Sequence, residues 1–344
     1  MGHPGQHTER EILSQPEAWA ATLAAVQNQA SQADEFYRRG AYDAVVFTGC
    51  GSTYYLALAA AATLQELAGI PARGLPASEI WLRPHTAPPA GRRTLLVAVS
   101  RSGETTETVR ACQAFRARAL GDVLTLSCYP GRPLTALGTV NLLFPAGQEE
   151  SIAQTRAFTC LYLAAVAVAA SWAGRDDMLA ELARLPEAGR RLLDGYRALA
   201  DSLGSDPALD RFYFLGSGPR YGLACELSLK MKEMSLSHSE PFHFMEFRHG
   251  PISMVTPGTL MVALLSASSR PQEAAVLVDV RARGARVLAM AESDADVTFD
   301  ARVGEAAADV LYLPVGQLLA LARARSRGLD PDRPHNLTAV VRLE

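Results

Sequence analysis

The stretch AVVFTGCGSTYYLALAAAATLQEL, residues 44–67, decides the fold of this chain. It opens with a short apolar run, turns at a glycine-rich segment and continues as an Ala- and Leu-rich helix. Residues 94–99 and 123–127 are two more short apolar runs, and a helix is predicted near residues 104–119. Strands that alternate with helices in this way are typical of an α/β domain with a parallel sheet.

The second half of the chain repeats this plan. Gly49 and Gly216 lie 167 residues apart, and Ser100 and Ser266 lie 166 residues apart. Any two α/β units look alike in part, but ordered recurrence at a nearly constant offset favours a duplicated domain. The matching stretches are 44–67 with 212–234, 94–100 with 259–266, and 116–127 with 281–291.

Composition excludes several classes of protein. The 344 residues are 49% hydrophobic and 20% charged, with a net charge of -3, so neither a disordered chain nor a generally basic nucleic-acid binder is expected. The longest apolar run, residues 160–173, is too short to span a bilayer, and the first residues lack the pattern of a signal peptide. Five cysteines without a C-x-x-C pair predict a reduced, cytoplasmic protein.

Three hydroxyl-rich segments of the first half occupy positions where α/β proteins bind ligands. They are residues 49–53, 100–106 and 151–156, each after a strand or ahead of a helix. Helix N-termini carry unpaired N–H groups, and Ser and Thr add neutral donors, so together they attract anions. Helix capping alone would explain any one segment. Several segments favour a phosphorylated ligand, although no P-loop or dinucleotide fingerprint is present.

Residues 226–251 of the second half carry a different pattern. Glu226, Lys230 and Glu233 are spaced to share one helix face, beside a stripe of Leu and Met. A salt-bridge ladder on the surface is the alternative reading. The His- and Glu-rich residues 238–249 could suggest a metal site, but H-E-x-x-H is absent, and general acid–base chemistry fits better. No metal and no cofactor is expected.

These motifs resemble the sugar isomerase (SIS) family, in particular the isomerase region of glucosamine-6-phosphate synthases. The resemblance implies two SIS domains, each a doubly wound αβα sandwich with a parallel five-stranded, flavodoxin-like sheet. It also implies a homodimer that binds a small phosphosugar, with no nucleic-acid or membrane partner. The five matching segments are EREILSQPEA (9–18), GCGSTYYLA (49–57), SRSGETTET (100–108), ELSLKMKEMSLSHSE with EFRHGP (226–251) and DPDRPHNLTAVVRLE (330–344).

The resemblance also implies roles for single residues. Glu233 matches the base that moves a proton between C1 and C2, and His249 matches a ring-opening histidine supplied by the neighbouring subunit. Lys230 and Glu226 match supporting positions, with Lys230 counted among the catalytic residues. The positions implied to bind substrate are Cys50, Gly51, Ser52, Thr53, Ser100, Arg101, Ser102, Thr105, Ile152, Ala153 and Glu226.

Two departures from the synthases bear on the expected reaction. The synthases have a glutaminase domain that is not expected here. They also have a lysine in the C-terminal tail that forms a Schiff base, whereas this chain has Ala339 at that position. The expected protein is therefore a glutamine-independent, aminotransferase-like isomerase or deaminase of a hexose or amino-sugar 6-phosphate. The alternatives are a fructosamine-6-phosphate deglycase and a non-catalytic regulatory protein.

The expected organisation has five parts. They are an N-terminal helical segment (1–30), a first SIS domain (31–175), a linker helix (176–205), a second SIS domain (206–325) and a C-terminal tail over the active site (326–344).

Overall fold

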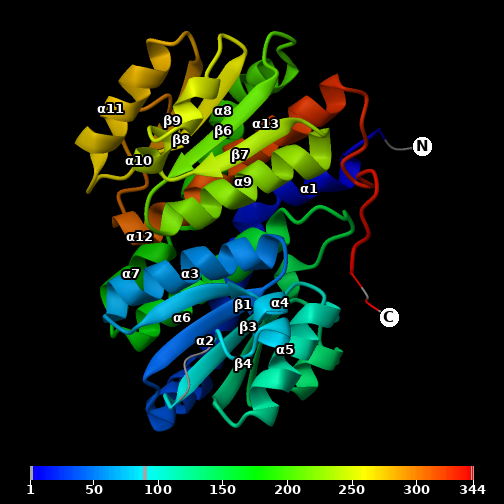
Figure 1. Cartoon of the computed structure of the whole chain (residues 1–344), viewed down its shortest axis with the longest axis vertical. Coiled ribbons are helices and arrows are strands. Elements are labelled where there is room, and N and C mark those ends of the chain that lie inside the picture. Colours follow the sequence, from blue (N-terminus) through cyan, green and yellow to red (C-terminus); the bar gives the residue numbers. More distant parts are fainter. Residues whose placement is uncertain (1–2, 88–90, 342, 344) are drawn as a thin grey trace. The chain divides into compact units, whose positions relative to one another are not determined.

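The computed structural model describes residues 3–87, 91–341 and 343, and the chain divides into two compact units (Figure 1). The first unit is made of Glu17–Glu149, Arg156–Ala183 and Thr338–Glu344. The second unit is made of Met1–Pro16, Glu150–Thr155 and Arg184–Leu337. Each unit therefore combines segments that are far apart in the sequence.

The first unit contains a five-stranded sheet in the order β2-β1-β3-β4-β5, with every neighbouring pair parallel. Its elements are α2 (Gln15–Gly40), β1 (Ala44–Gly49), α3 (Ser52–Ala68), β2 (Ala72–Pro76), α4 (Ala77–Leu82), β3 (Thr94–Ser100), α5 (Thr106–Ala117), β4 (Gly121–Ser127), η1 (Pro133–Ala136), β5 (Val140–Leu143), η2 (Pro145–Gly147), α6 (Arg156–Trp172) and α7 (Asp176–Leu182).

Burial explains why this sheet forms. Every residue of β1 and β3 is buried. Continuous apolar runs such as these are typical of strands that are covered on both faces of the sheet. In Figure 1, α4 and α5 lie on one side of the labelled strands, and α3 and α6 lie on the other. Between the sheet and α5, Leu96, Ala111 and Phe115 belong to one hydrophobic cluster. The first unit is thus a three-layer αβα sandwich.

The second unit has the same strand order as the first, because β10-β9-β8-β6-β7 becomes 2-1-3-4-5 when its strands are renumbered along the chain. All of its strand pairs are parallel. Its elements are α1 (Gln6–Leu13), α8 (Leu185–Ser205), β6 (Arg211–Gly216), α9 (Pro219–Ser235), β7 (His238–Phe242), α10 (Phe244–Phe247), η3 (Pro251–Met254), β8 (Thr259–Leu264), α11 (Arg270–Arg281), β9 (Arg286–Ala291), β10 (Val297–Thr298), α12 (Glu305–Ala308), η4 (Asp309–Tyr312) and α13 (Leu313–Ser326).

The duplication predicted from the sequence is confirmed down to single glycines. Gly51 and Gly218 precede equivalent helices with φ 55° and ψ -124° or -131°, a backbone region that favours glycine. A Cβ at Gly49 would come within 2.7 Å of the Thr53 backbone, and one at Gly216 within 2.5 Å of the Arg220 backbone. In both units a glycine ends the first strand because the next helix packs directly against it.

The stretch Glu305–Ser326, which covers α12, η4 and α13, is the one described helix long and apolar enough to cross a membrane. However, 89% of its most apolar window is buried within the structure. Gln317 in α13 is buried and hydrogen-bonds to Gln15 (2.9 Å) and to the Thr155 carbonyl (3.2 Å). This stretch is the central packed helix of the second unit.

Candidate active site

The order of strands in the first unit brings two of the hydroxyl-rich segments together. Strand β1 pairs with β2 on one side and with β3 on the other, so the connections after β1 and β3 leave in opposite directions. Open α/β sheets bind ligands at such a switch point, beyond the carboxyl ends of the strands. Residues 50–53 and 100–105 follow these two strand ends, and Cys50 Sγ lies 3.5 Å from Thr108 Oγ1 of α5.

The turn after β1 is held by the hydroxyl of Thr53. Thr53 Oγ1 accepts from the Cys50 amide (2.9 Å) and donates to the Cys50 carbonyl (3.0 Å), so it closes the turn. Ser52 begins α3 with 4% of its surface exposed. The Thr53 and Tyr54 amides that follow it already donate to the Cys50 carbonyl (3.2 Å) and the Gly51 carbonyl (3.0 Å). Burial raises the pKa of Cys50 to about 11, so its thiol is protonated near neutral pH.

The turn after β3 places hydroxyl groups at the start of α5. Ser100 Oγ accepts from the Gly103 amide (3.1 Å) and lies 3.5 Å from Thr105 Oγ1. Ser102 Oγ accepts from the Glu104 amide (3.2 Å), which leaves its O–H to donate elsewhere. Thr105 is the N-cap residue of α5. The turn has the donors and the helix end that an anion requires.

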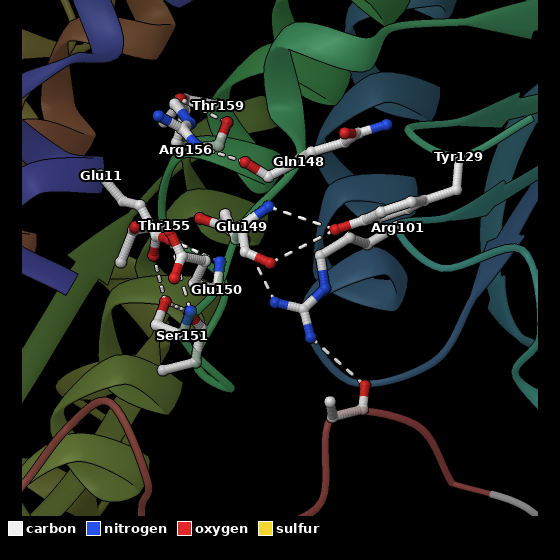
Figure 2. A network of polar contacts seen from close by, with 12 residues as sticks. Glu11, Arg101, Tyr129, Gln148, Glu149, Glu150, Ser151, Thr155, Arg156 and Thr159 are labelled. Atoms are coloured by element: carbon white, nitrogen blue, oxygen red, sulfur yellow. Dashed lines mark hydrogen bonds and ion pairs between the residues drawn. The ribbon is translucent and has the colours of Figure 1, made fainter. Parts of the chain in front are cut away.

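Arg101 differs from its neighbours because its guanidinium already has protein partners (Figure 2). It is 7% exposed, and it donates to Glu149 Oε2 (3.1 Å) and to the Ala339 carbonyl (3.2 Å). The hydroxyl of Tyr129 donates to the Glu149 carbonyl (3.3 Å) and accepts from its amide (3.4 Å). Arg101 therefore links the turn after β3 to the C-terminal tail.

The tail makes two further hydrogen bonds at the start of α5. The Thr106 amide donates to the Val341 carbonyl (3.3 Å), and the Leu343 amide donates to Thr106 Oγ1 (3.1 Å). Val341 and Leu343 of the tail therefore lie at the same helix end as the hydroxyl-rich turn.

In the second unit, Glu226, Lys230 and Glu233 form a buried charged row along α9. Lys230 is 1% exposed, and its Nζ lies 3.5 Å from Glu226 Oε1 and in direct contact with Glu233 Oε2. The Glu226 side chain is fully buried, whereas 20% of the Glu233 side chain is exposed. A surface ladder would not bury Lys230, so that alternative is wrong. Glu233 is the carboxylate of this row that reaches solvent.

His249 lies on an exposed turn of the second unit. Its amide donates to the Glu246 carbonyl (3.0 Å), and Gly250 follows with φ 125°. His243 instead stacks on Tyr221 with ring centroids 3.8 Å apart, and burial lowers its pKa. Among the residues that the structure describes, no three His, Cys, Asp or Glu side chains gather as metal ligands.

Ile152 and Ala153 belong to a short segment of the second unit that α1 holds in place. The carboxylate of Glu11 is buried and accepts from the Glu150 amide (2.6 Å), the Ser151 amide (3.3 Å) and the Ser151 hydroxyl (Figure 2). The Ile152 amide donates to the Asp332 carbonyl (3.2 Å). Helix α1 thus fixes the backbone on which these two predicted residues stand.

Comparison with known proteins agrees with this duplicated architecture. The model of the SIS domain family matches residues 42–171 and 209–310, one match for each sheet. The chain belongs to the SIS domain family. The first unit therefore holds the first SIS domain, and the second unit holds the second SIS domain.

Relatives of the whole chain are larger proteins. The chain is 31% identical to glutamine–fructose-6-phosphate aminotransferase [isomerizing] of Acidithiobacillus ferridurans over 98% of its length, and 31% identical to that of Aeropyrum pernix over 97%. It spans 57–58% of the length of these two relatives.

Among solved structures, the chain is similar to glucosamine-6-phosphate deaminase from Thermotoga maritima. The two share 27% identity with a TM-score of 0.78, over 93% of this chain and 99% of the other. The C-terminal domain of glucosamine-fructose-6-phosphate aminotransferase from Francisella tularensis, at 24% identity and a TM-score of 0.81, shares the fold.

Sequence reasoning missed three residues that shape these sites. Glu149 binds Arg101, and Glu11 binds the segment 150–151, across separations of 48 and about 140 residues that no local pattern reveals. Gln154 is the third: its Oε1 is shielded from solvent and has no hydrogen-bond partner among the described residues, a rare state for a buried polar atom.

Proposed function

We propose that this SIS protein is an isomerising deaminase of an amino-sugar 6-phosphate, with glucosamine 6-phosphate as the substrate. Water and glucosamine 6-phosphate would give fructose 6-phosphate and ammonia. The observation that carries the proposal is Glu233, a partly exposed carboxylate fixed by the buried Lys230. The similarity to the deaminase of Thermotoga maritima over nearly all of both chains supports the choice of substrate.

The proposed chemistry needs one base and no amine from the protein. In the open-chain substrate, Glu233 takes the C2 proton to give an enolamine and returns it to C1, so that C2 becomes an iminium. Water then adds to C2 and ammonia leaves. The nitrogen of the imine comes from the substrate, which agrees with an alanine at position 339, where the synthases that the chain resembles have their Schiff-base lysine.

Phosphate recognition is assigned to the first SIS domain. The hydroxyls of Ser52, Ser100, Ser102 and Thr105 would supply neutral donors, beside the positive ends of α3 and α5. Charge-assisted hydrogen bonds contribute about 1.5–3 kcal/mol each, so loss of the phosphate should abolish binding at millimolar concentration. Glucosamine, which lacks only the phosphate, is the matched control ligand.

The test measures both reaction products and the exchange of hydrogen at C1 with solvent. Purified protein is incubated with glucosamine 6-phosphate, and ammonia and fructose 6-phosphate are quantified, with deuterium incorporation at C1 followed by NMR in D₂O. We expect equal amounts of both products. In Glu233→Gln, turnover should fall by about 10²–10⁴, the usual contribution of a general base, while binding changes by a few-fold.

Three outcomes would overturn the proposal. Binding without turnover would indicate a regulatory protein, and turnover of fructosamine 6-phosphate alone would indicate a deglycase. Unchanged exchange at C1 in Glu233→Gln would leave Glu233 as a structural partner of Lys230.

A further inference from the structure

The turn after β8 in the second SIS domain shares one hydrogen bond with the phosphate-binding turn predicted in the first. Ser266 Oγ accepts from the Ser269 amide (3.0 Å), just as Ser100 Oγ accepts from the Gly103 amide (3.1 Å). Both hydrogen bonds join residues i and i+3 at the end of the third strand of a sheet with the same strand order. Ser268 follows Ser266 by two residues, as Ser102 follows Ser100, although the second turn reaches its helix sooner, with Ser269 as the N-cap of α11 where Thr105 is the N-cap of α5.

A carboxylate from the same domain occupies this copy of the turn. Glu305 Oε2 accepts from the Ser268 amide (3.1 Å), and Glu305 Oε1 accepts from the Ser268 hydroxyl (3.1 Å). Arg220 also donates to Glu305 Oε1. One carboxylate thus takes an amide, a hydroxyl and a guanidinium at the start of α11.

Arg220 is placed by the same duplication. It lies four residues after Gly216, as Thr53 lies four residues after Gly49, so each is the second residue of the helix that follows the first strand of its sheet. It is 4% exposed, and its Nε lies 3.2 Å from Asp309 Oδ1. A buried guanidinium beside a serine and a backbone amide is a donor set that suits phosphate as well as carboxylate.

We propose that the second SIS domain retains an anion-binding site that Glu305 closes by occupying it with its own carboxylate. The site would accept a phosphate group only when that carboxylate is removed. The inference does not depend on the proposed function, since it concerns inorganic phosphate and a turn of the second domain alone.

The residues around Glu305 leave space for a phosphate group but also limit its affinity. A cavity of about 450 Å³ borders the site and is lined by Glu305, Arg270 and Tyr312 among others. Asp309 would continue to pair with Arg220 after Glu305 is removed. Glu292 and Asp294 also line the cavity, and their negative charges oppose a phosphate dianion. Phosphate is therefore expected to bind weakly and saturably.

The test compares Glu305→Ala with the wild-type protein by calorimetry and ³¹P NMR, with inorganic phosphate as the probe and chloride at equal ionic strength as the reference. We expect Glu305→Ala to bind one more phosphate per chain than the wild type. The additional site should disappear in the double variant Glu305→Ala with Ser268→Ala. Glu305→Gln should bind phosphate more weakly than Glu305→Ala, because the amide still fills nearly the volume of the carboxylate, although its nitrogen cannot accept from Ser268 or Arg220.

Thermal unfolding gives a second readout if the alanine variant is unstable. Phosphate should raise the unfolding temperature of Glu305→Ala, or of Glu305→Ser, saturably and more than that of the wild type. Equal phosphate stoichiometry and equal thermal shifts in wild type and variants would overturn the proposal. So would a wild-type crystal structure in which phosphate replaces Glu305 at Ser268, since the site would then be open.

Discussion

Ser102 and Ser268 each lie two residues after a serine that accepts from the amide three residues on, which makes them a matched pair for mutation. Ser102 Oγ accepts from the Glu104 amide, whereas Ser268 Oγ donates to Glu305. Ser102→Ala should weaken glucosamine 6-phosphate binding by about tenfold or more, the value of one or more charge-assisted hydrogen bonds. Ser268→Ala should leave that affinity unchanged. Titration calorimetry measures both, and a large fall in unfolding temperature for Ser102→Ala would mean that its role is to cap α5.

The cysteines allow a prediction about pH. Burial raises the pKa of Cys50 to about 11 and those of Cys112, Cys160 and Cys225 to about 12. These thiols are protonated at pH 8, and we expect slow reaction with dithionitrobenzoate until the protein is unfolded, when all five cysteines react.

The raised pKa values of these cysteines also predict how the stability of the fold changes with pH. A folded-state pKa above the unfolded value of about 8.5 stabilises the fold below that pH, and the contribution is lost as pH rises toward 11 and beyond. The free energy of unfolding should therefore fall between pH 9 and 11. Rapid labelling of Cys50 in the native state at pH 8 would contradict this reading.

At the scale of elements, helix α1 is held to residues 150–151 by one buried side chain. Glu11→Ala would leave the Glu150 and Ser151 amides without their acceptor, while the Ser151 hydroxyl could still donate to the Ala153 carbonyl (3.0 Å). Loss of the acceptor of a buried donor costs about 1–3 kcal/mol. We expect a clear fall in unfolding temperature and faster hydrogen exchange at the Glu150 and Ser151 amides. Glu66→Ala, an exposed position of α3, is the control and should change little. Unchanged exchange at both amides would mean that other contacts hold the segment.

Two glycines of the second unit, Gly195 in α8 and Gly216 at the end of β6, should respond to alanine in opposite directions. Gly195 is exposed in the middle of α8, and a Cβ there would meet no atom within 4 Å, so Gly195→Ala should stabilise by about 0.5–1 kcal/mol. Gly216→Ala would instead press a Cβ against the Arg220 backbone and should destabilise strongly. Thermal unfolding of the two variants compares them directly. Equal shifts would contradict the close packing of β6 against α9.

At the scale of the whole molecule, local patterns predicted the fold because each element carries its own signal. The apolar runs of β1 and β3 and the glycine turns were legible in the sequence, and their repetition predicted two sheets of one topology. The polar row of α9 was placed beside its apolar stripe, but only the packed structure distinguishes a buried Lys230 from a surface one. Spacing along one helix is the same in both cases.

The contacts that escaped prediction join distant segments. Glu305 is 37 residues from Ser268 and 85 residues from Arg220 in the sequence. No local sequence motif contains Glu305 together with either partner. Such pairs arise when the sheet brings strand ends together, so they follow from tertiary structure rather than from composition or periodicity. A duplicated sequence predicts equivalent turns, but not which side chain fills one of them.

The last prediction concerns assembly, since the resemblance of His249 to a histidine of the neighbouring subunit implies a shared active site. His249 is exposed on its turn, and Met245 and Met254 on either side in the sequence are 46% and 52% exposed, which is apolar surface suited to an interface. Glu233→Gln and His249→Ala should each be inactive alone. After subunit exchange, a mixed dimer would have one site with an intact Glu233 from one chain and an intact His249 from the other.

With random pairing of equal amounts, half of the dimers are mixed and half of their sites are intact, so about a quarter of wild-type activity should return. The measurement is ammonia release before and after mixing, with Glu233→Gln mixed with itself as the control. An active monomer in sedimentation, or no recovery after verified exchange, would place Glu233 and His249 of one chain in the same site and reject the shared arrangement.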